Sequence, residues 1–297
     1  MAEIVIIGSG VVGKASGKGF LAKGNDVYFC DRSAEVLETL GQQGYKTVTL
    51  DGLARGNFDF YMFSLPTPTN GHGVELKALR SVAELVAAGL KTNTHHYPVV
   101  VIRSTVPPGT TSNELCPIFE RFSGKACGVD FGVAFNPEYL REGSAEQDFL
   151  EPWITVLGVD QEKTWEKLVA IYYPFRSEIY RLSVLEAEFQ KYVHNIYNAT
   201  KISYFNEMRL MAKQLDIDPE KAFNLTTLSA EGMFHPTYGI RDFGPFGGAC
   251  LPKDTSGFLY FAREKGLPMP LLTAVIEVNN QFKNTDHKDS IVEERDN

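Results

Sequence analysis

The residues best suited to covalent chemistry lie in one short segment, Phe246-Gly247-Gly248-Ala249-Cys250-Leu251-Pro252-Lys253-Asp254. Its glycines allow the backbone to approach a ligand closely, because they lack a Cβ atom. Asp254 is expected to cap a helix that ends at Gly266. A cysteine beside a lysine at a helix N-terminus favours a reactive thiolate. A lone cysteine is more often a buried structural residue, but the clustering with Lys253 and Asp254 favours Cys250 as a nucleophile.

A second segment suited to chemistry is the glycine turn Gly8-Ser9-Gly10-Val11-Val12-Gly13. It directly follows a short apolar run at residues 3–7, and a helical pattern and a second strand ending in Asp31 come after it. This order is typical of a dinucleotide-binding fold, in which amides at a helix N-terminus hold the pyrophosphate. Asp31 would bond the ribose hydroxyls and repel a 2′-phosphate, which favours NAD as the cofactor.

Two Pro/Thr-rich turns follow later strands. A strand expected at 58–65 leads to Thr67, and one expected at 98–102 leads to Ser104 and Thr105. Ligands of open α/β sheets bind at the carboxyl ends of strands, so the threonine hydroxyls are candidates for contacts with a cofactor or substrate. Ordinary turn chemistry is the alternative for each threonine taken singly.

A pair of carboxylates follows a further strand, expected at 129–135. Glu138 and Glu142 lie four residues apart in the segment Asn136-Pro137-Glu138-Tyr139-Leu140-Arg141-Glu142-Gly143. Their position at a strand end makes them candidates for acid–base chemistry. A solvated surface loop is the alternative.

The elements that must position these residues form two predicted domains. Strands alternating with helices over residues 1–183 predict an α/β fold with a doubly wound, Rossmann-like parallel sheet. Ser183 and Glu186 have the spacing of a capping box and begin a long helix expected to reach about residue 215. Lys191 and Asn195 lie four apart on one face of it, which is either a pocket lining or a solvated face. Residues 184–297 are thus predicted to be helical, and to carry Cys250.

The composition excludes several classes of protein. The chain has 297 residues, 43% of them apolar, and a net charge of −8, which argues against nucleic acid or an anionic membrane as its main partner. No apolar run approaches the ~18 residues of a membrane span. The four cysteines have neither metal-ligand nor disulfide-framework spacing, so we predict no metal. We expect a cytoplasmic protein.

Six motifs occur in the order found in the UDP-glucose/GDP-mannose dehydrogenase family, which the chain resembles nearly from end to end. The motifs are Gly8-x-Gly10-x-x-Gly13, Thr67-Pro68-Thr69, Ser104-Thr105-Val106-Pro107, Asn136 to Gly143, Glu186-Ala187-Glu188 through Lys191 and Asn195 to Asn206-Glu207, and Gly247 to Asp254. The resemblance implies a Rossmann-like domain followed by a helical dimerisation domain, with a homodimer as the assembly.

The resemblance also implies a reaction. A nucleotide sugar, most simply UDP-glucose, would be oxidised at its CH₂OH group to a carboxylate by two NAD⁺ in turn, through a thiohemiacetal and a thioester on Cys250. Lys191 and Asn195 would stabilise the oxyanion and an ordered water. Asp254 would orient that water or take its proton, and Glu138 would be the acid–base for the thioester step.

Further binding residues are implied by the same resemblance. Gly8, Gly10, Val11, Val12, Gly13 and Asp31 would hold the cofactor, with Thr67 and Lys253 at its nicotinamide end. Thr105 and Glu142 would lie between cofactor and substrate. The substrate-binding residues would be Glu138, Tyr139, Leu140, Lys191, Asn195, Gly247 and Arg241, the last of these reaching a neighbouring subunit's substrate.

Two other functions stay open. Family members continue into a third, nucleotide-clamping domain, whereas this sequence ends in a short charged tail after residue 283. An NAD-binding relative without catalysis is therefore one alternative. The other is a β-hydroxyacid dehydrogenase of the 6-phosphogluconate type, which also has a Rossmann domain and a Lys-x-x-x-Asn pair. That class needs no cysteine, so the segment around Cys250 counts against it.

Overall fold

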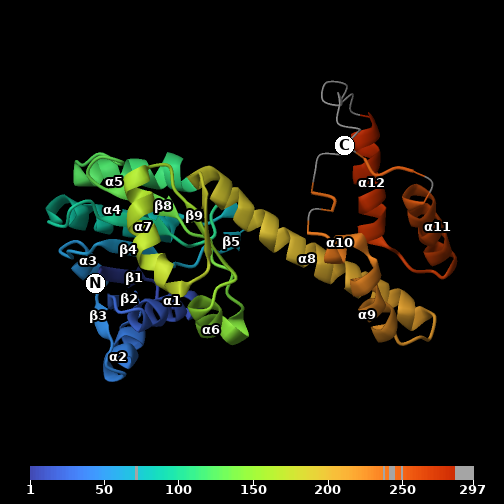
Figure 1. Cartoon of the computed structure of the whole chain (residues 1–297), viewed down its shortest axis with the longest axis horizontal. Coiled ribbons are helices and arrows are strands. Elements are labelled where there is room, and N and C mark those ends of the chain that lie inside the picture. The colour runs from blue at the N-terminus through green and yellow to red at the C-terminus, as the bar shows by residue number, and fades with distance from the viewer. Residues whose placement is uncertain (71–72, 237, 241–244, 249, 285–297) are drawn as a thin grey trace. The chain divides into compact units, whose positions relative to one another are not determined.

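The computed structural model describes residues 1–70, 73–236, 238–240, 245–248 and 250–284 (Figure 1). The chain divides into two compact units, residues 1–194 and 195–297. The long helix α8 (Val184–Gln214) crosses this division. The domain boundary expected between residues 183 and 184 stays a prediction.

The described part of the first unit contains an eight-stranded sheet with the order β10-β9-β8-β7-β4-β1-β2-β3. Its strands are β1 (Glu3–Ile7), β2 (Asp26–Cys30), β3 (Lys46–Val48), β4 (Phe60–Phe63), β7 (Val99–Ile102), β8 (Gly132–Phe135), β9 (Ile154–Gly158) and β10 (Glu178–Leu182). All neighbours from β3 to β8 pair in parallel, whereas β9 is antiparallel to β8 and parallel to β10. The predicted doubly wound α/β fold is confirmed, with a mixed sheet at one edge.

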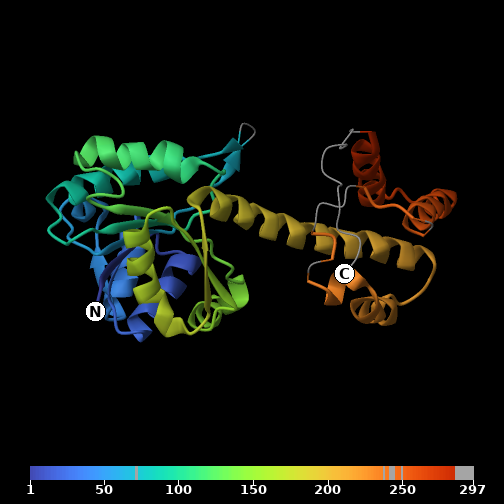
Figure 2. The ribbon, with the colours of Figure 1, turned by 45° about the horizontal axis from the view of Figure 1, so that its top comes forward.

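Helices cover both faces of this sheet (Figures 1 and 2). Alternate strand residues pack on one face with α3, α4, α5 and the start of α8, and on the other face with α1, α2, α6 and α7. The helical segments are α1 (Val11–Ala22), α2 (Ala34–Gln42), α3 (Leu50–Leu53), α4 (Lys77–Thr92), the π-helical turn η1 (Thr111–Leu115), α5 (Cys116–Ser123), η2 (Glu142–Ser144), α6 (Ala145–Leu150), α7 (Glu162–Tyr172) and η3 (Tyr173–Phe175). A short hairpin of β5 (Thr69–Asn70) and β6 (Gly73–Val74) follows β4.

Apolar periodicity explains how a helix such as α4 is placed. Its buried residues recur at helical spacing, at positions 79, 82, 83, 86, 87 and 90, and pack against the sheet. Such a stripe covers one face of a helix and leaves the other to solvent. The sequence therefore determines which face of α4 is buried.

The strand order places a binding crevice between β1 and β4. The chain proceeds outward from β1 to β2 and β3 on one side, and from β4 to β7 and β8 on the other. The carboxyl ends of strands at such a reversal are where ligands bind in open α/β sheets. The turn after Ile7 and the segment after Phe63 meet at this point.

The second unit is helical in its described residues. It consists of the later part of α8 with α9 (Glu220–Ser229), α10 (Glu231–Phe234), α11 (Leu251–Glu264) and α12 (Pro270–Asn284). A small core of Met211, Ala262 and Met269 joins α8 to the later helices. The Glu207 carboxylate of α8 accepts hydrogen bonds from the amides of Leu271 and Leu272, at 2.8 and 3.1 Å. The carboxylate thereby satisfies two backbone amides in the first turn of α12, where a negative charge is also favourable.

Two helix starts test the sequence predictions. The capping box is confirmed, because the Glu186 carboxylate accepts from the Ser183 amide at 2.8 Å and the Ser183 hydroxyl accepts from the Glu186 amide at 3.2 Å. The expected cap at Asp254 is wrong. Helix α11 begins at Leu251 with Cys250 as its N-cap residue, and Asp254 lies within the first turn. Pro252 does not prevent this, since proline is tolerated in the first turn of a helix.

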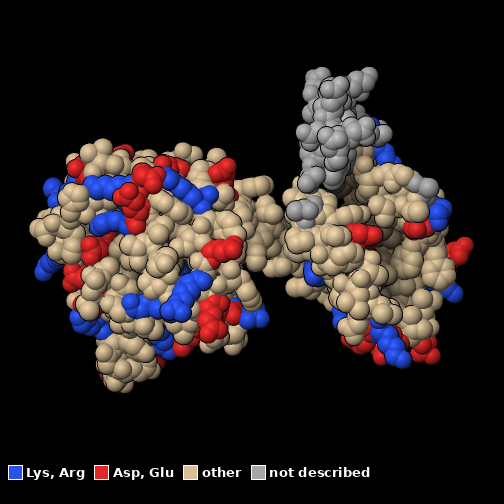
Figure 3. Space-filling model, in the orientation of Figure 1, with Lys and Arg blue, Asp and Glu red and all other residues tan. Residues whose placement is uncertain are grey.

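The surface carries mixed charges. Figure 3 shows basic and acidic side chains interspersed over the visible face of the first unit. Among the described helices, none has both the length and the apolarity that a bilayer-spanning segment requires.

Candidate functional site

The glycine turn after β1 is shaped by close backbone contacts. Gly8 has φ +93°, and a Cβ atom there would lie 2.4 Å from the main-chain oxygen of Ser64. A Cβ atom on Gly13 would lie 1.9 Å from the main-chain oxygen of Gly8. Both distances are far below van der Waals contact, so only glycine allows this turn to pack against β4 and lead into α1.

The same turn fits the pyrophosphate of a dinucleotide. Gly10 is the N-cap residue of α1, and a Cβ atom there would meet nothing within 4 Å. No side chain caps α1 and its first turn, which begins with Val11 and Val12, contains no acid. Beside Gly8, the Ser64 hydroxyl is buried without a hydrogen-bond partner among the described residues. Open space, uncapped amides and an unsatisfied hydroxyl together suit an anionic ligand at this helix N-terminus.

Asp31 lies at the end of β2, next to this turn. Its carboxylate accepts hydrogen bonds from the amides of Ser9, at 2.8 Å, and Ser33, at 2.9 Å. These bonds fix the orientation of the carboxylate and leave lone pairs for further donors. The Asp31 carboxylate can therefore also accept hydrogen bonds from ribose hydroxyls, as the predicted contact requires.

The turns after β4 and β7 are tied to each other. The Thr67 hydroxyl donates to the Thr105 carbonyl at 2.7 Å, and the Ser104 hydroxyl donates to the Leu65 carbonyl at 2.7 Å. The two Pro/Thr-rich turns are thus neighbours at the carboxyl edge of the sheet, as their positions after the strands predict. They extend the crevice that begins at the glycine turn.

Glu188 of α8 holds the segment that follows Thr105. Its buried carboxylate accepts from the amides of Gly109 and Thr111, the first at 2.5 Å and the second at 2.8 Å. Burial raises the pKa of Glu188 above its ordinary value, although these donors oppose the rise. This role of Glu188 was not predicted; the signal for it in the sequence is its position three residues before Lys191 on the same helix.

The segment after β8 brings Glu138 and Lys191 together. Lys191 Nζ lies 3.2 Å from Glu138 Oε1 and also donates to the main-chain oxygen of Glu138. The other carboxylate oxygen, Oε2, accepts from the Leu140 amide at 2.9 Å. Both side chains are held in place, so the residue expected to act as acid–base, Glu138, and one expected to stabilise the oxyanion, Lys191, form one ion pair.

Two more ionisable side chains flank this ion pair. The Tyr139 and His194 rings lie 4.7 Å apart, and the Tyr139 hydroxyl donates to Gln190. Burial raises the pKa of Tyr139 well above its usual value. Burial, and then the nearby Lys191 charge, lower the pKa of His194. Both side chains therefore favour their neutral forms near pH 7.

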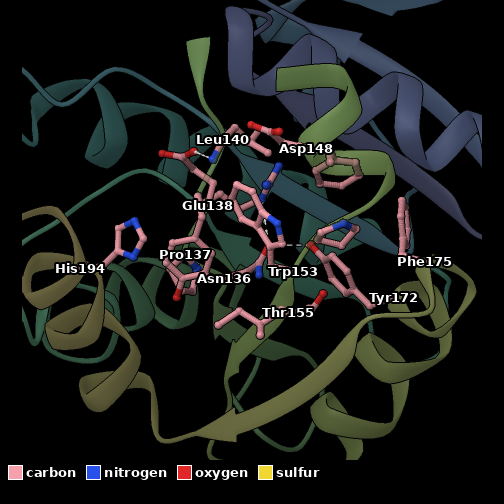
Figure 4. Close-up of a pocket in the computed structure, with 15 residues that line it drawn as sticks. Asn136, Pro137, Glu138, Leu140, Asp148, Trp153, Thr155, Tyr172, Phe175 and His194 are labelled. Carbon is pink, nitrogen blue, oxygen red and sulfur yellow. Dashed lines mark hydrogen bonds between the residues drawn. The ribbon is translucent and has the colours of Figure 1, made fainter. Parts of the chain in front are cut away.

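A cavity of about 270 Å³ adjoins the same segment (Figure 4). Glu138, Tyr139 and Leu140, all expected to bind substrate, line it together with Trp153 and His194. Three buried residues of the lining with polar groups, Arg103, Asn136 and Tyr172, were not assigned a role from the sequence. The Asn136 amide oxygen accepts from Arg103 Nε at 3.0 Å and from the Tyr172 hydroxyl at 2.7 Å.

The next residues along this segment are anchored by a salt bridge. The Arg141 guanidinium donates to both oxygens of Asp148, at 2.7 and 3.0 Å. These bonds hold the pKa of Asp148 well below its usual range. Glu142 begins η2, and its side chain lies outside what the structure describes.

The cysteine segment belongs to the second unit. Cys250 is exposed, and Lys253 Nζ lies 2.5 Å from Asp254 Oδ1 within the same turn of α11. A cavity of about 1080 Å³ in this unit is lined by Gly247 and Leu251, on either side of Cys250, and by residues of α12. Asn195 is exposed on α8, and Arg241 lies outside the described residues. Across the part of the chain that the structure describes, no three His, Cys, Asp or Glu side chains group as metal ligands do.

Comparison with known proteins decides the family. A model of the NAD-binding domain of the UDP-glucose/GDP-mannose dehydrogenase family matches residues 47–176, and a model of its central domain matches residues 185–281. The chain belongs to the UDP-glucose/GDP-mannose dehydrogenase family. The presence of the family's NAD-binding domain identifies NAD as the cofactor, which agrees with the fit of the glycine turn and Asp31 described above.

Individual proteins that resemble this chain are nucleotide-sugar dehydrogenases of the same family. GDP-mannose 6-dehydrogenase of Azotobacter vinelandii is 33% identical over 298 residues, which cover 93% of this chain and 68% of the relative. UDP-glucose 6-dehydrogenase of Haloferax volcanii is 31% identical, with 94% and 69% covered. A crystal structure of a ternary complex of GDP-mannose dehydrogenase from Pseudomonas aeruginosa has a TM-score of 0.87 and 28% identity, with 95% and 69% covered.

Proposed function

We propose that this chain oxidises the CH₂OH group of a nucleotide sugar to a carboxylate, with NAD as the electron acceptor and Cys250 as a covalent nucleophile. The observation that carries the proposal is the exposed position of Cys250 at the start of α11, between two residues that line a large cavity. This segment lies within the family's central domain. UDP-glucose is the substrate expected from the sequence, and GDP-mannose is the other to test, because relatives named for each are similarly close.

Cys250 would keep the intermediate bound between the two oxidations. Bound NAD supplies the hydride acceptor. The Cys250 sulfur forms a bond to the aldehyde carbon and the carbonyl oxygen gains a proton, which gives a thiohemiacetal. Loss of a hydride and a proton leaves a thioester, and attack by water then releases the carboxylic acid and restores the thiol. A sulfur at a helix N-terminus is well placed for this, since the local dipole favours negative charge.

Proton transfer and charge stabilisation are assigned to polar residues of each unit. In the first unit, Lys191 would stabilise an oxyanion and Glu138 would serve as the acid–base of the thioester step. The salt bridge and the Leu140 amide orient the Glu138 carboxylate for that role. In the second unit, Asp254 would orient the attacking water, and Asn195 would hold it.

The remaining assignments concern binding. The glycine turn would hold the NAD pyrophosphate and Asp31 the ribose, while Thr67, Thr105, Glu142 and Lys253 would contact the nicotinamide end or separate it from the substrate. Tyr139, Leu140 and Gly247 line cavities and would contact the sugar nucleotide. Arg241 would reach the substrate of a second subunit.

A homodimer is part of the proposal, and the surface of α8 supports it. Leu185, Phe189, Val193 and Ile196 recur at helical spacing along α8 and are each about half exposed or more, at 56, 60, 49 and 60%. A contiguous exposed apolar stripe of this kind is typical of a protein–protein interface. Light scattering of the purified protein should give twice the chain mass, and Phe189→Glu should shift it toward one chain mass.

Replacing Cys250 tests the mechanism. Cys250→Ser and Cys250→Ala should lose net oxidation of the nucleotide sugar while they still bind NAD, measured by calorimetry, because the glycine turn is untouched. Cys116→Ser, which alters another free cysteine, is the matched control and should retain NADH formation. Full turnover by Cys250→Ser would rule out covalent catalysis by this residue.

A further inference from the structure

A pair of free cysteines lies at α5 and the turn that follows it, outside the sites described above. Cys116 is the first residue of α5, and Cys127 follows the turn that leads from α5 toward β8. Both are half-buried, and both pack against the core on the α4 and α5 face of the sheet. The proposed dehydrogenase chemistry uses neither thiol.

The local backbone brings the two thiols together. Gly124 ends α5 in the left-handed conformation, with φ +71°, and reverses the chain direction. The Cys127 amide then donates to Glu120 Oε1 at 3.0 Å. Because Glu120 is one helical turn after Cys116, the two share a face of α5, and this bond brings Cys127 to that face. The Cys116 and Cys127 side chains are thereby close enough for each thiol to shift the pKa of the other.

The proximity of the two thiols makes them chemically unequal. The neighbouring Cys116 lowers the pKa of Cys127, against the effects of burial and the Glu120 charge. The neighbouring Cys127, together with burial, strongly raises the pKa of Cys116. Since the thiolate is the nucleophile in thiol–disulfide exchange, Cys127 is the residue that reacts first, and Cys116 is the neighbouring thiol that can resolve the product.

We propose that Cys116 and Cys127 form a reversible dithiol–disulfide site whose oxidant is a low-molecular-weight disulfide such as oxidised glutathione. The Cys127 thiolate attacks one sulfur of the oxidant, which forms a mixed disulfide and releases one glutathione thiolate. Cys116 then gives up its proton and attacks the Cys127 sulfur, which releases the second glutathione. The two protein thiols lose two electrons and two protons in total, and the oxidant is reduced to two thiols.

Peptide mapping of the full chain tests this site. The native protein is treated with oxidised glutathione, its remaining thiols are alkylated, and it is digested with trypsin without reduction. Peptides 104–121 and 126–141 contain Cys116 and Cys127 respectively, because trypsin cleaves after Arg121 and Lys125. We expect these two peptides to be joined, with the loss of two hydrogens, and to separate after dithiothreitol. Exposed Cys250 should carry glutathione and thereby shows that the reagent was active.

Two variants distinguish the roles of the thiols. In Cys116→Ser, we expect glutathione to stay attached to Cys127, because the resolving thiol is gone. In Cys127→Ser, we expect Cys116 to be recovered unmodified. A wild-type protein in which Cys250 carries glutathione but peptides 104–121 and 126–141 stay separate would overturn the proposal. This readout is a peptide mass, so it is independent of whether the chain oxidises a nucleotide sugar.

Discussion

Lys191 Nζ and Glu138 Oε1 lie 3.2 Å apart and join α8 to the segment after β8 across 53 residues of sequence. The lysine side chain is 5% exposed and the glutamate side chain 18%. Separating the two charges of a nearly buried ion pair is costly, because each would then be a buried charge without compensation. The two side chains therefore stay paired. The pair therefore fixes the geometry of two residues assigned to the reaction.

Lys191→Met should destabilise the protein by about 3 kcal/mol, because it leaves the Glu138 carboxylate buried without its cation. Urea unfolding measures this difference. Lys201→Met, at an exposed position of the same helix, is the control and should change the free energy of unfolding by no more than about 0.5 kcal/mol. Adding Glu138→Gln to Lys191→Met should recover part of the loss. Equal effects of the two lysine variants would contradict a structural ion pair.

Two glycines of the same turn should respond differently to alanine. Gly13→Ala places a Cβ atom 1.9 Å from the Gly8 oxygen and should destabilise the first unit and abolish NAD binding. At Gly10 a Cβ atom has open space, so Gly10→Ala should unfold at the wild-type urea concentration. Despite its unchanged stability, Gly10→Ala should bind NAD more weakly than the wild type, because the methyl group occupies the space that the pyrophosphate needs. Wild-type NAD affinity of folded Gly10→Ala would place the cofactor elsewhere.

Glu188→Gln should cost about 1–3 kcal/mol of stability, because the glutamine amide has one acceptor oxygen and one of the two backbone amides loses its partner. Glu188→Ala should cost more, since both Gly109 and Thr111 amides are left unpaired. Thermal unfolding of both variants shows which one loses more stability. Glu186→Gln is the comparison, because the Glu186 carboxylate caps α8 at an exposed position. This variant should lose the least stability of the three.

His194 should titrate below pH 6.5, because burial and the Lys191 charge disfavour its protonated form. A folded-state pKa below the unfolded value means that the unfolded chain binds the proton more readily. The contribution of His194 to stability is therefore complete above pH 6.5 and is lost as pH falls toward the folded-state pKa. NMR titration of the His194 ring protons measures the pKa directly. Lys191→Met should move it upward, and a midpoint above 6.5 in the wild type would contradict the assigned environment.

Much of the fold could be predicted from local patterns in the sequence. The apolar runs of β1 and β7, the glycine turn and the capping box at Ser183 each depend on neighbouring residues, and each lies where its pattern indicates. The short strand β3 was not predicted, because its three residues are largely exposed and lack an apolar signal. The antiparallel pairing of β9 with β8 was also missed, since strand direction leaves no local trace in the sequence.

Contacts between distant residues were the least predictable part of the site. Glu138 and Lys191 could be selected singly, but their salt bridge depends on how α8 packs against the first unit. The role of Glu188 depends on amides 77 and 79 residues away. The start of α11 was misjudged because Asp254 is a common cap residue, whereas the helix begins earlier, with Pro252 in its first turn.

The ratio of NADH formed to nucleotide sugar consumed tests the central claim most directly. The purified protein is given excess NAD and a limiting amount of UDP-glucose or, separately, GDP-mannose, and NADH is followed by absorbance until the reaction ends. We predict two NADH for each sugar oxidised, and a uronate as the product by mass spectrometry. One NADH per sugar with an aldehyde product, or no NADH from either sugar by a protein that binds NAD, would contradict this account.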